Sequence, residues 1–196
     1  MLAKVSGPDR GGLEVKMRVA FDWGHAGKRS APTDPGAVSP VTGEEERYWA
    51  GRMVVELDRY ADVAGVTPYI LADGEYRDRA RRLEAELYLD LVVYVHWDSG
   101  SVKNGRVFYV SDAGMHYAER IAAELAELAG RPLGSVRAVL ADGRSTPGGV
   151  GLLRCPKAPA VLLELAGVDQ VRDLAPSLPG IAHKIMGAIR AAWDAA

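Results

Sequence analysis

Three residues of types that ligate metals or transfer protons stand at the ends of apolar segments in this sequence. His25 follows a stretch in which apolar and polar residues alternate, His96 ends the apolar run 89–95, and Glu164 lies near the end of the run 160–165. In open α/β sheets, ligands bind beyond the carboxyl ends of the strands. If these segments are strands of one sheet, the three side chains lie close to one another.

A fourth residue of this kind, Glu46, comes from the segment VTGEEER, which offers three adjacent carboxylates. Glu46 continues the apolar stripe of the helix that follows, because it lies three, four and seven residues before members of that stripe. The stripe consists of Trp49, Ala50, Met53 and Leu57. The spacing therefore predicts that Glu46 faces inward.

The other two carboxylates of this segment have simpler explanations. Glu45 lies about 100° around the helix from Glu46, and it follows Thr42 by three residues, which is the spacing of a capping box. We expect it to be a solvated capping residue. Glu44 is expected in the first helical turn, where the helix dipole favours an acidic side chain.

Two histidines and one glutamate form the ligand set of a catalytic zinc site that keeps a fourth position for water. Taken singly, His25 or His96 is best explained as a hydrogen-bonded side chain at a sheet edge, and only the combination with Glu46 favours a metal. Glu164 is left over from this set. An acidic residue in an apolar strand is costly to bury unless it is paired, ligated or used, so we expect Glu164 to be the acid/base group of a metal-assisted hydrolysis.

The order of predicted elements indicates an α/β fold with one open, twisted sheet of about six strands, largely parallel or mixed, and helices on both faces. Strand patterns occur at 15–22, 66–71, 89–95, 106–110, 135–140 and 160–165. Helical patterns occur at 42–64, 76–87, 115–128 and 181–193. We expect residues 1–14 to be an N-terminal extension and residues 15–196 to form a single catalytic domain.

The composition argues against several classes of partner. Lys and Arg total 24 against 26 for Asp and Glu, so the chain has no general basic field for nucleic acid or an anionic membrane. The single cysteine, Cys155, excludes an internal disulfide. The opening residues lack the apolar segment of a secretory signal, and we expect synthesis in the cytoplasm.

These residues resemble the motifs of a known family, the zinc-dependent N-acetylmuramoyl-L-alanine amidases of the type-3 class, which cleave bacterial peptidoglycan. DWGHAG resembles the family's D-P-G-H-G-G-like turn, and DPGAVSPVTGEEE resembles its D-P-G-A segment followed by G-x-x-E. LDLVVYVHWDS and APAVLLEL resemble the segments that carry the second histidine and the catalytic glutamate. The similarity runs from Val15 to Ile189, with departures at Trp23, Ala26, the longer loop 29–33 and Asp98.

The resemblance implies zinc as cofactor, His25, Glu46 and His96 as its ligands and Glu164 as the catalytic residue. It also implies peptidoglycan as the partner and cleavage of the amide between the lactyl group of N-acetylmuramic acid and L-alanine of the stem peptide. A phage or prophage endolysin released by a holin, or an autolysin of the producing cell, fits this expectation.

Two alternatives stay open on the sequence alone. One is a zinc amidohydrolase of similar fold that acts on a small N-acyl amino acid, and the other is a non-catalytic wall-binding protein. The sequence assigns no role to Asp98, Arg144 or Lys157, and it does not determine the oligomeric state.

Overall fold

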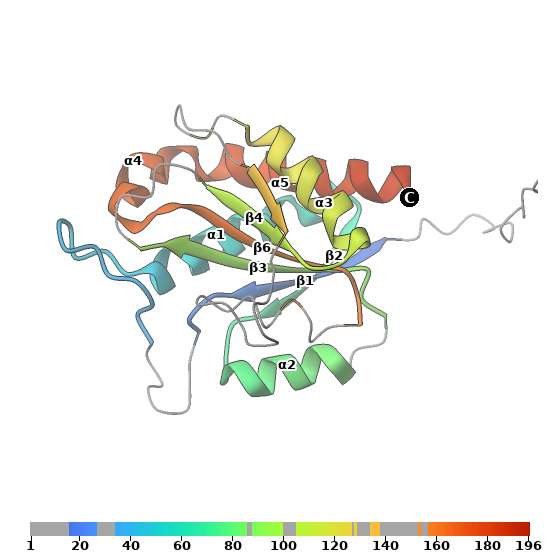
Figure 1. Cartoon of the computed structure of the whole chain (residues 1–196), viewed down its shortest axis with the longest axis horizontal. Coiled ribbons are helices and arrows are strands. Elements are labelled where there is room, and N and C mark those ends of the chain that lie inside the picture. Colours follow the sequence, from blue (N-terminus) through green and yellow to red (C-terminus); the bar gives the residue numbers. More distant parts are fainter. Residues whose placement is uncertain are drawn as a thin grey trace, which may run out of the picture.

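The computed structural model describes residues 16–26, 34–85, 88–99, 105–126, 128, 134–137, 153 and 157–196. These residues contain a six-stranded sheet with strand order β2-β1-β3-β6-β4-β5 (Figure 1). The strands are β1 (Met17–Trp23), β2 (Val66–Leu71), β3 (Leu91–Asp98), β4 (Arg106–Tyr109), β5 (Gly134–Arg137) and β6 (Ala160–Gly167). The first four in sheet order are parallel, whereas β4 runs antiparallel to β6 and β5 runs parallel to β4. The predicted α/β fold with a mixed sheet is confirmed.

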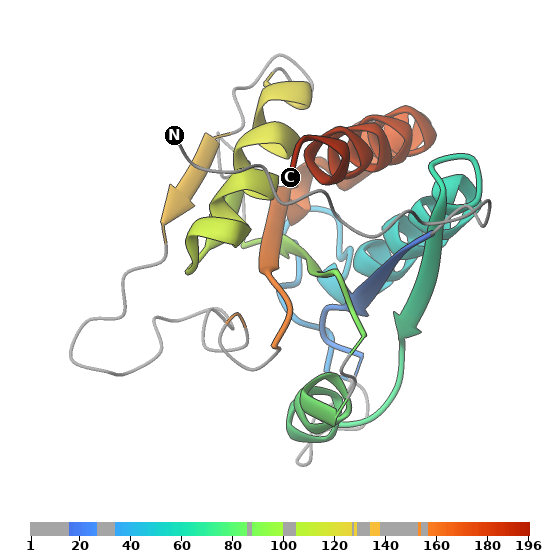
Figure 2. The ribbon, with the colours of Figure 1, turned by 90° about the vertical axis from the view of Figure 1, so that its right-hand side faces the viewer.

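Helices cover both faces of this sheet, as predicted. Three of them, α1 (Glu46–Ala61), α3 (Asp112–Glu124) and α5 (Leu178–Ala195), lie on one face, and α2 (Tyr76–Ala85) lies on the other (Figure 2). A short helix, α4 (Val171–Leu174), flanked by single 3-10 turns, leads from β6 into α5 and was not expected from the sequence. Within the described part of the chain, no helix has both the length and the apolar character needed to cross a bilayer.

The alternation of side chains along the central strands decides which face of the sheet carries the predicted site. On β3, Val93 and Val95 join the large core beneath α1, α3 and α5, whereas Val92 and Tyr94 join the smaller core on the side of α2. Successive side chains of a strand point to opposite faces, so His96 follows Val92 and Tyr94 onto the side of α2. Both faces of β3 are buried, which explains its near-continuous apolar sequence.

Helix α1 begins later than the sequence pattern indicated. Thr42 is not its cap: the hydroxyl of Thr42 accepts a hydrogen bond from the Glu44 amide, and Glu45 is the N-cap residue without a side-chain capping bond. Glu45 is exposed, but the predicted capping box is wrong. The expectation for Glu44 is also wrong, because this residue precedes the helix.

Carbonyl groups of the preceding loop replace the missing side-chain cap. The amide of Glu46 donates to the carbonyl of Ala37 at 2.8 Å, and the amide of Arg47 donates to that of Pro35 at 3.0 Å. These bonds satisfy amides that a helix start otherwise leaves unpaired. The loop therefore determines where α1 begins and, with it, the position of Glu46. At the other end α1 stops at Ala61, and Gly65, with a positive φ of 67°, lies in the turn to β2.

Several sequence expectations fall outside the described residues. These are the N-terminal extension 1–14, the long loop 29–33, the end of the strand predicted at 135–140, Arg144 and Cys155. Lys157 is described and is exposed.

A buried ion pair fastens α2 to the sheet. Arg79 donates from Nε to Oδ2 of Asp22 at 2.7 Å and from Nη2 to Oδ1 at 3.3 Å, and both side chains are 1% exposed. The Nη1 group donates to the carbonyl of Gly74 at 2.7 Å. Because the pair is dry, removing one partner leaves an uncompensated charge in the interior.

We expect the variant R79M to lose about 3–5 kcal/mol of unfolding free energy, measured by urea denaturation, because Asp22 stays buried without its partner. The double variant D22N/R79M should recover much of that loss. As a matched control on the same helix, R82M removes the exposed ion pair of Arg82 with Asp73 and its hydrogen bond to the Asp73 carbonyl, and it should change the free energy by less than about 1 kcal/mol. Equal losses in R79M and R82M would contradict the role given to the buried pair.

Candidate metal centre

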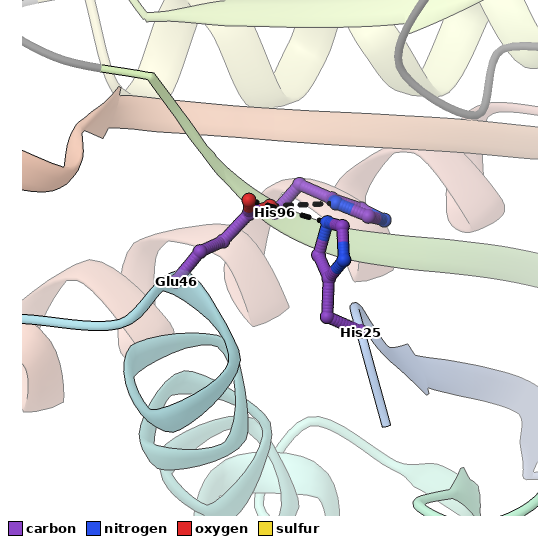
Figure 3. Close-up of side chains that lie close together, drawn as sticks. All are labelled: His25, Glu46 and His96. Atoms are coloured by element: carbon purple, nitrogen blue, oxygen red, sulfur yellow. Dashed lines mark hydrogen bonds and ion pairs between the residues drawn. The ribbon is translucent and has the colours of Figure 1, made fainter. Parts of the chain in front are cut away.

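Three of the predicted site residues meet at one edge of the sheet. His25 follows the end of β1, His96 lies on β3, and Glu46 opens α1 (Figure 3). Each residue offers one ligand atom, and these atoms lie within 4.8 Å of one another. The side chains come from segments up to 71 positions apart, since 96 − 25 = 71, so the fold alone brings them together.

The Glu46 carboxylate links the two imidazole rings. Its Oε1 lies 2.8 Å from Nδ1 of His96, and its Oε2 lies 3.2 Å from Nε2 of His25. Two backbone amides also donate to it, from Trp97 to Oε1 at 3.2 Å and from Ala37 to Oε2 at 2.9 Å. Burial disfavours its charge, but the hydrogen bonds from His25 and His96 outweigh this and lower the pKa of Glu46 to about 2. Glu46 is therefore a buried, ionised and rigidly held carboxylate.

His25 is held in an unusual backbone conformation. Its φ is 58°, and among the described residues no other non-glycine has a positive φ. The hydroxyl of Tyr76 accepts a hydrogen bond from the His25 amide at 3.2 Å, and the Asp34 carboxylate lies 3.0 Å from Nδ1 of the ring. A histidine with this φ costs free energy and persists only when its surroundings hold it. Here α2, through Tyr76, and the loop before α1, through Asp34, supply those contacts.

The protonation of His25 follows from the same contacts. Burial lowers the pKa of His25, but Glu46 on one ring nitrogen and Asp34 on the other raise it overall above its usual range. Both ring nitrogens face a carboxylate oxygen, and each of these contacts stabilises the charged form of the ring.

Two glycines let the ligand side chains approach one another. A Cβ on Gly36, whose φ is 70°, would lie 2.6 Å from Oε2 of Glu46 and 2.7 Å from the ring of His25. A Cβ on Gly24 would lie 2.4 Å from the carbonyl of Val95 and 2.9 Å from the ring of His96. The missing side chain of Gly24 therefore leaves room for the ring of His96.

Contacts with the segment after β6 anchor the loop that leads into α1 and Glu46. The Ser39 hydroxyl donates to Oδ1 of Asp169 at 2.5 Å, and Nε of Arg172 donates to Oε1 of Glu44 at 2.5 Å. The Trp49 indole donates to the other oxygen of Glu44 at 2.7 Å. The true role of Glu44 is therefore to join this loop to α1 and to the segment around α4.

Glu164 lies beside the three-residue cluster and outside it. Its Cα pairs with that of His96 across β3 and β6, so both side chains point to the same face of the sheet. Its Oε2 is buried and has no hydrogen-bond partner among the described residues. Burial, followed by the charges of Glu46 and Asp98, raises the pKa of Glu164 to about 9, and Arg106 opposes this rise. Without a metal, Glu164 therefore carries a proton at neutral pH.

The donor set fits a divalent metal. Two imidazoles and a carboxylate are ligands that zinc accepts, and Nε2 of His96 is buried without a partner in the described part of the chain. A carboxylate on the far nitrogen of a ligating histidine, as Asp34 is to His25, is the usual means of fixing the ring's orientation. A cation in this cluster would bind the ring nitrogen of His25 and the Glu46 oxygen that face one another at 3.2 Å.

Some residues that position this site were not found from the sequence. Asp34 was aligned within the D-P-G-A segment but received no role, and neither Tyr76 nor Arg106 was singled out for the site. Tyr76 was assigned only to an amphipathic stripe, and a spacing of 51 residues from its partner His25 leaves no pattern to detect. Asp34 offered a weak signal as an acidic residue in a Gly/Pro loop near His25.

The similarity of this chain to known proteins lies in its fold. No protein-family model and no curated protein sequence matches the chain. Among solved structures, Cwp6 from Clostridium difficile matches with a TM-score of 0.72 and 18% identity over 96% of this chain, which spans 30% of the length of Cwp6. The catalytic domain of the CD27L endolysin targeting Clostridia difficile matches with a TM-score of 0.68 and 21% identity, covering 88% of this chain and 96% of that domain. The N-acetylmuramoyl-L-alanine amidase AmiC2 of Nostoc punctiforme matches with a TM-score of 0.66 and 21% identity, covering 93% of this chain and 96% of AmiC2.

The fold is that of the N-acetylmuramoyl-L-alanine amidases. At these identities the likeness establishes the amidase fold, and the activity has to be argued from the site. In this amidase fold, the His25, Glu46 and His96 cluster lies where the predicted strands end.

The variant D34N tests whether Asp34 orients His25 for a metal. We expect Zn²⁺ affinity, measured by competition with a chromophoric chelator, to fall about 10- to 100-fold, the usual cost of losing a group that orients a ligand. D73N changes an exposed aspartate elsewhere and should leave the affinity unchanged. An unaltered affinity in D34N would show that His25 needs no such support.

The raised pKa of Glu164 predicts a pH dependence of the metal-free protein. Between about pH 4.5 and pH 9 the folded protein keeps a proton on Glu164 that the unfolded chain has lost, so stability falls as the pH rises through this window. We expect the urea midpoint of E164Q, measured with chelator present, to fall less between pH 5 and pH 8 than that of the wild type. Parallel pH profiles for the two proteins would contradict this assignment.

Proposed function

We propose that this protein is a zinc-dependent N-acetylmuramoyl-L-alanine amidase that cleaves the bond between the lactyl group of N-acetylmuramic acid and L-alanine of the peptidoglycan stem. One observation carries the proposal: the ligand atoms of His25, Glu46 and His96 lie within 4.8 Å of one another, with Glu164, whose buried Oε2 has no partner among the described residues, in register with His96. The fold shared with amidases supports the choice of substrate.

His25, Glu46 and His96 would hold the metal. The chemistry that zinc supplies when bound is polarisation of the amide carbonyl and acidification of water. The protein keeps these ligands in place before any metal arrives, because Glu46 is fixed by two backbone amides and His25 by Tyr76 and Asp34.

Glu164 moves the proton that the reaction requires. Hydrolysis forms a bond from water oxygen to the lactyl carbonyl carbon and breaks the bond from that carbon to the nitrogen of L-alanine. The Glu164 carboxylate accepts the proton that the attacking water gives up and delivers it to the departing nitrogen, which leaves as an amine. A nearby divalent cation favours the ionised form of Glu164, which this role needs at the start of the cycle.

The setting of this activity is the bacterial cell wall. We propose that the protein is made in the cytoplasm and reaches peptidoglycan after release, as an endolysin or an autolysin. The similarity in fold to the catalytic domain of the endolysin CD27L supports this setting.

The decisive experiment combines metal analysis of the purified protein with mass spectrometry of digested peptidoglycan. We expect about one zinc per chain, and we expect stem peptides with free L-alanine amino termini together with intact glycan strands that carry free lactyl carboxylates. A protein that binds walls without releasing stem peptides would be a binding protein, and release of acid only from small N-acyl amino acids would indicate the other amidohydrolase class.

The variant E164Q separates proton transfer from metal binding. We expect it to retain the wild-type zinc content, measured by atomic absorption, and to lose at least about 100-fold in kcat, because it cannot carry the proton. E45Q changes the exposed neighbour of the ligand Glu46 and should keep both properties. Near-normal turnover in E164Q would remove Glu164 from the mechanism.

A further inference from the structure

Arg106 lies next in the row that His96, a proposed metal ligand, and Glu164, the proposed acid/base group, form across the sheet. The Cα atoms of His96 and Glu164 are partners across β3 and β6, and those of Glu164 and Arg106 are partners across β6 and β4. Partners in a ladder point to the same face. Because adjacent strands lie about 4.8 Å apart, Arg106 is displaced along the sheet by about 5 Å from Glu164 and about 10 Å from His96.

The guanidinium of Arg106 is held in place, and one of its donors has no partner in the part of the chain that the structure describes. It donates from Nη2 to Oδ2 of Asp98 and lies over the ring of Phe108, 5.2 Å from the ring centroid. Its Nε is buried and has no partner among the described residues, yet 42% of the side chain is exposed. A buried N–H without a partner is costly and needs an explanation. A hydrogen-bond acceptor supplied by a bound substrate would provide that explanation.

We propose that Arg106 binds a carboxylate of the substrate and makes the enzyme selective for stem peptides whose second residue has a free α-carboxylate. The inference rests on the proposed function. A guanidinium presents a planar fork that matches a carboxylate and forms charge-assisted hydrogen bonds with it. In an extended stem, the α-carboxylate of the residue after L-alanine lies about 6–8 Å from the scissile carbonyl carbon, given Cα atoms 3.8 Å apart. That length lies between the displacements of Arg106 from Glu164 and from His96, about 5 Å and about 10 Å.

The test distinguishes this role from an alternative in which Arg106 only balances the charges of Asp98 and Glu164 and makes no contact with substrate. In that case its loss would change the rate for every substrate by the same factor, because no part of the substrate would interact with it.

The test compares two soluble glycan-peptide fragments, N-acetylmuramoyl-L-alanyl-D-glutamate and the same compound with the α-carboxylate amidated. The readout is the ratio of their kcat/KM values with the zinc-loaded enzyme, which does not depend on the fraction of active protein. We expect the wild type to prefer the carboxylate about 10- to 100-fold, the range for hydrogen bonds to charged groups, and R106Q to reduce the preference to about twofold or less. R59Q, at an exposed arginine of α1, should retain the full preference.

The outcomes separate the two proposals. If the wild type cleaves both fragments equally, or if R106Q lowers both rates by one factor and leaves the ratio unchanged, Arg106 is not a substrate-binding residue, while the amidase activity stands. If the wild type cleaves neither fragment, the proposed function fails, and this inference fails with it.

Discussion

The carboxylate of Glu46 joins three parts of the chain that are remote in sequence: the turn after β1, the end of β3 and the start of α1. Burying a carboxylate is costly unless it is paired and hydrogen-bonded. The structure meets that requirement with two backbone amides and the two imidazoles of His25 and His96. The contacts that fix the start of α1 therefore also fix Glu46, which bridges the two histidines.

Contacts on two sides of the cluster hold its ligands in place. On the side of α2, the buried pair of Arg79 and Asp22 fastens the helix, and Arg79 also lies over the ring of Tyr76, 4.6 Å from its centroid. Tyr76 in turn holds the backbone of His25. On the other side, the bonds of Ser39 and Glu44 to the segment after β6 hold the loop that carries Glu46. A ligand set held this firmly loses little conformational entropy when a metal binds.

Two carboxylates in this small region have opposite protonation, and the cause is their surroundings. Glu46 receives hydrogen bonds from imidazoles and amides, and its pKa is about 2, whereas Oε2 of Glu164 is buried without a hydrogen-bond partner among the described residues, and the pKa of Glu164 is about 9. Such a difference in pKa suits chemically identical groups to different tasks. The ionised one suits a cation, and the one that exchanges a proton suits acid/base chemistry.

The sequence by itself determined the local features, because they depend on neighbours a few positions apart. Alternation and apolar runs predicted the six strands, and helical spacing predicted that Glu46 faces inward. The positions of His25, His96 and Glu164 at strand ends predicted that these side chains share one edge of the sheet. What only the tertiary structure decided depends on contacts between distant residues. The loop carbonyls that start α1 at Glu46, the contacts of Asp34 and Tyr76 with His25, and the reversal of β4 that brings Arg106 beside Glu164 are of this kind. None of them leaves a periodic trace in the chain, because each arises only when strands and loops that are remote in sequence pack against one another.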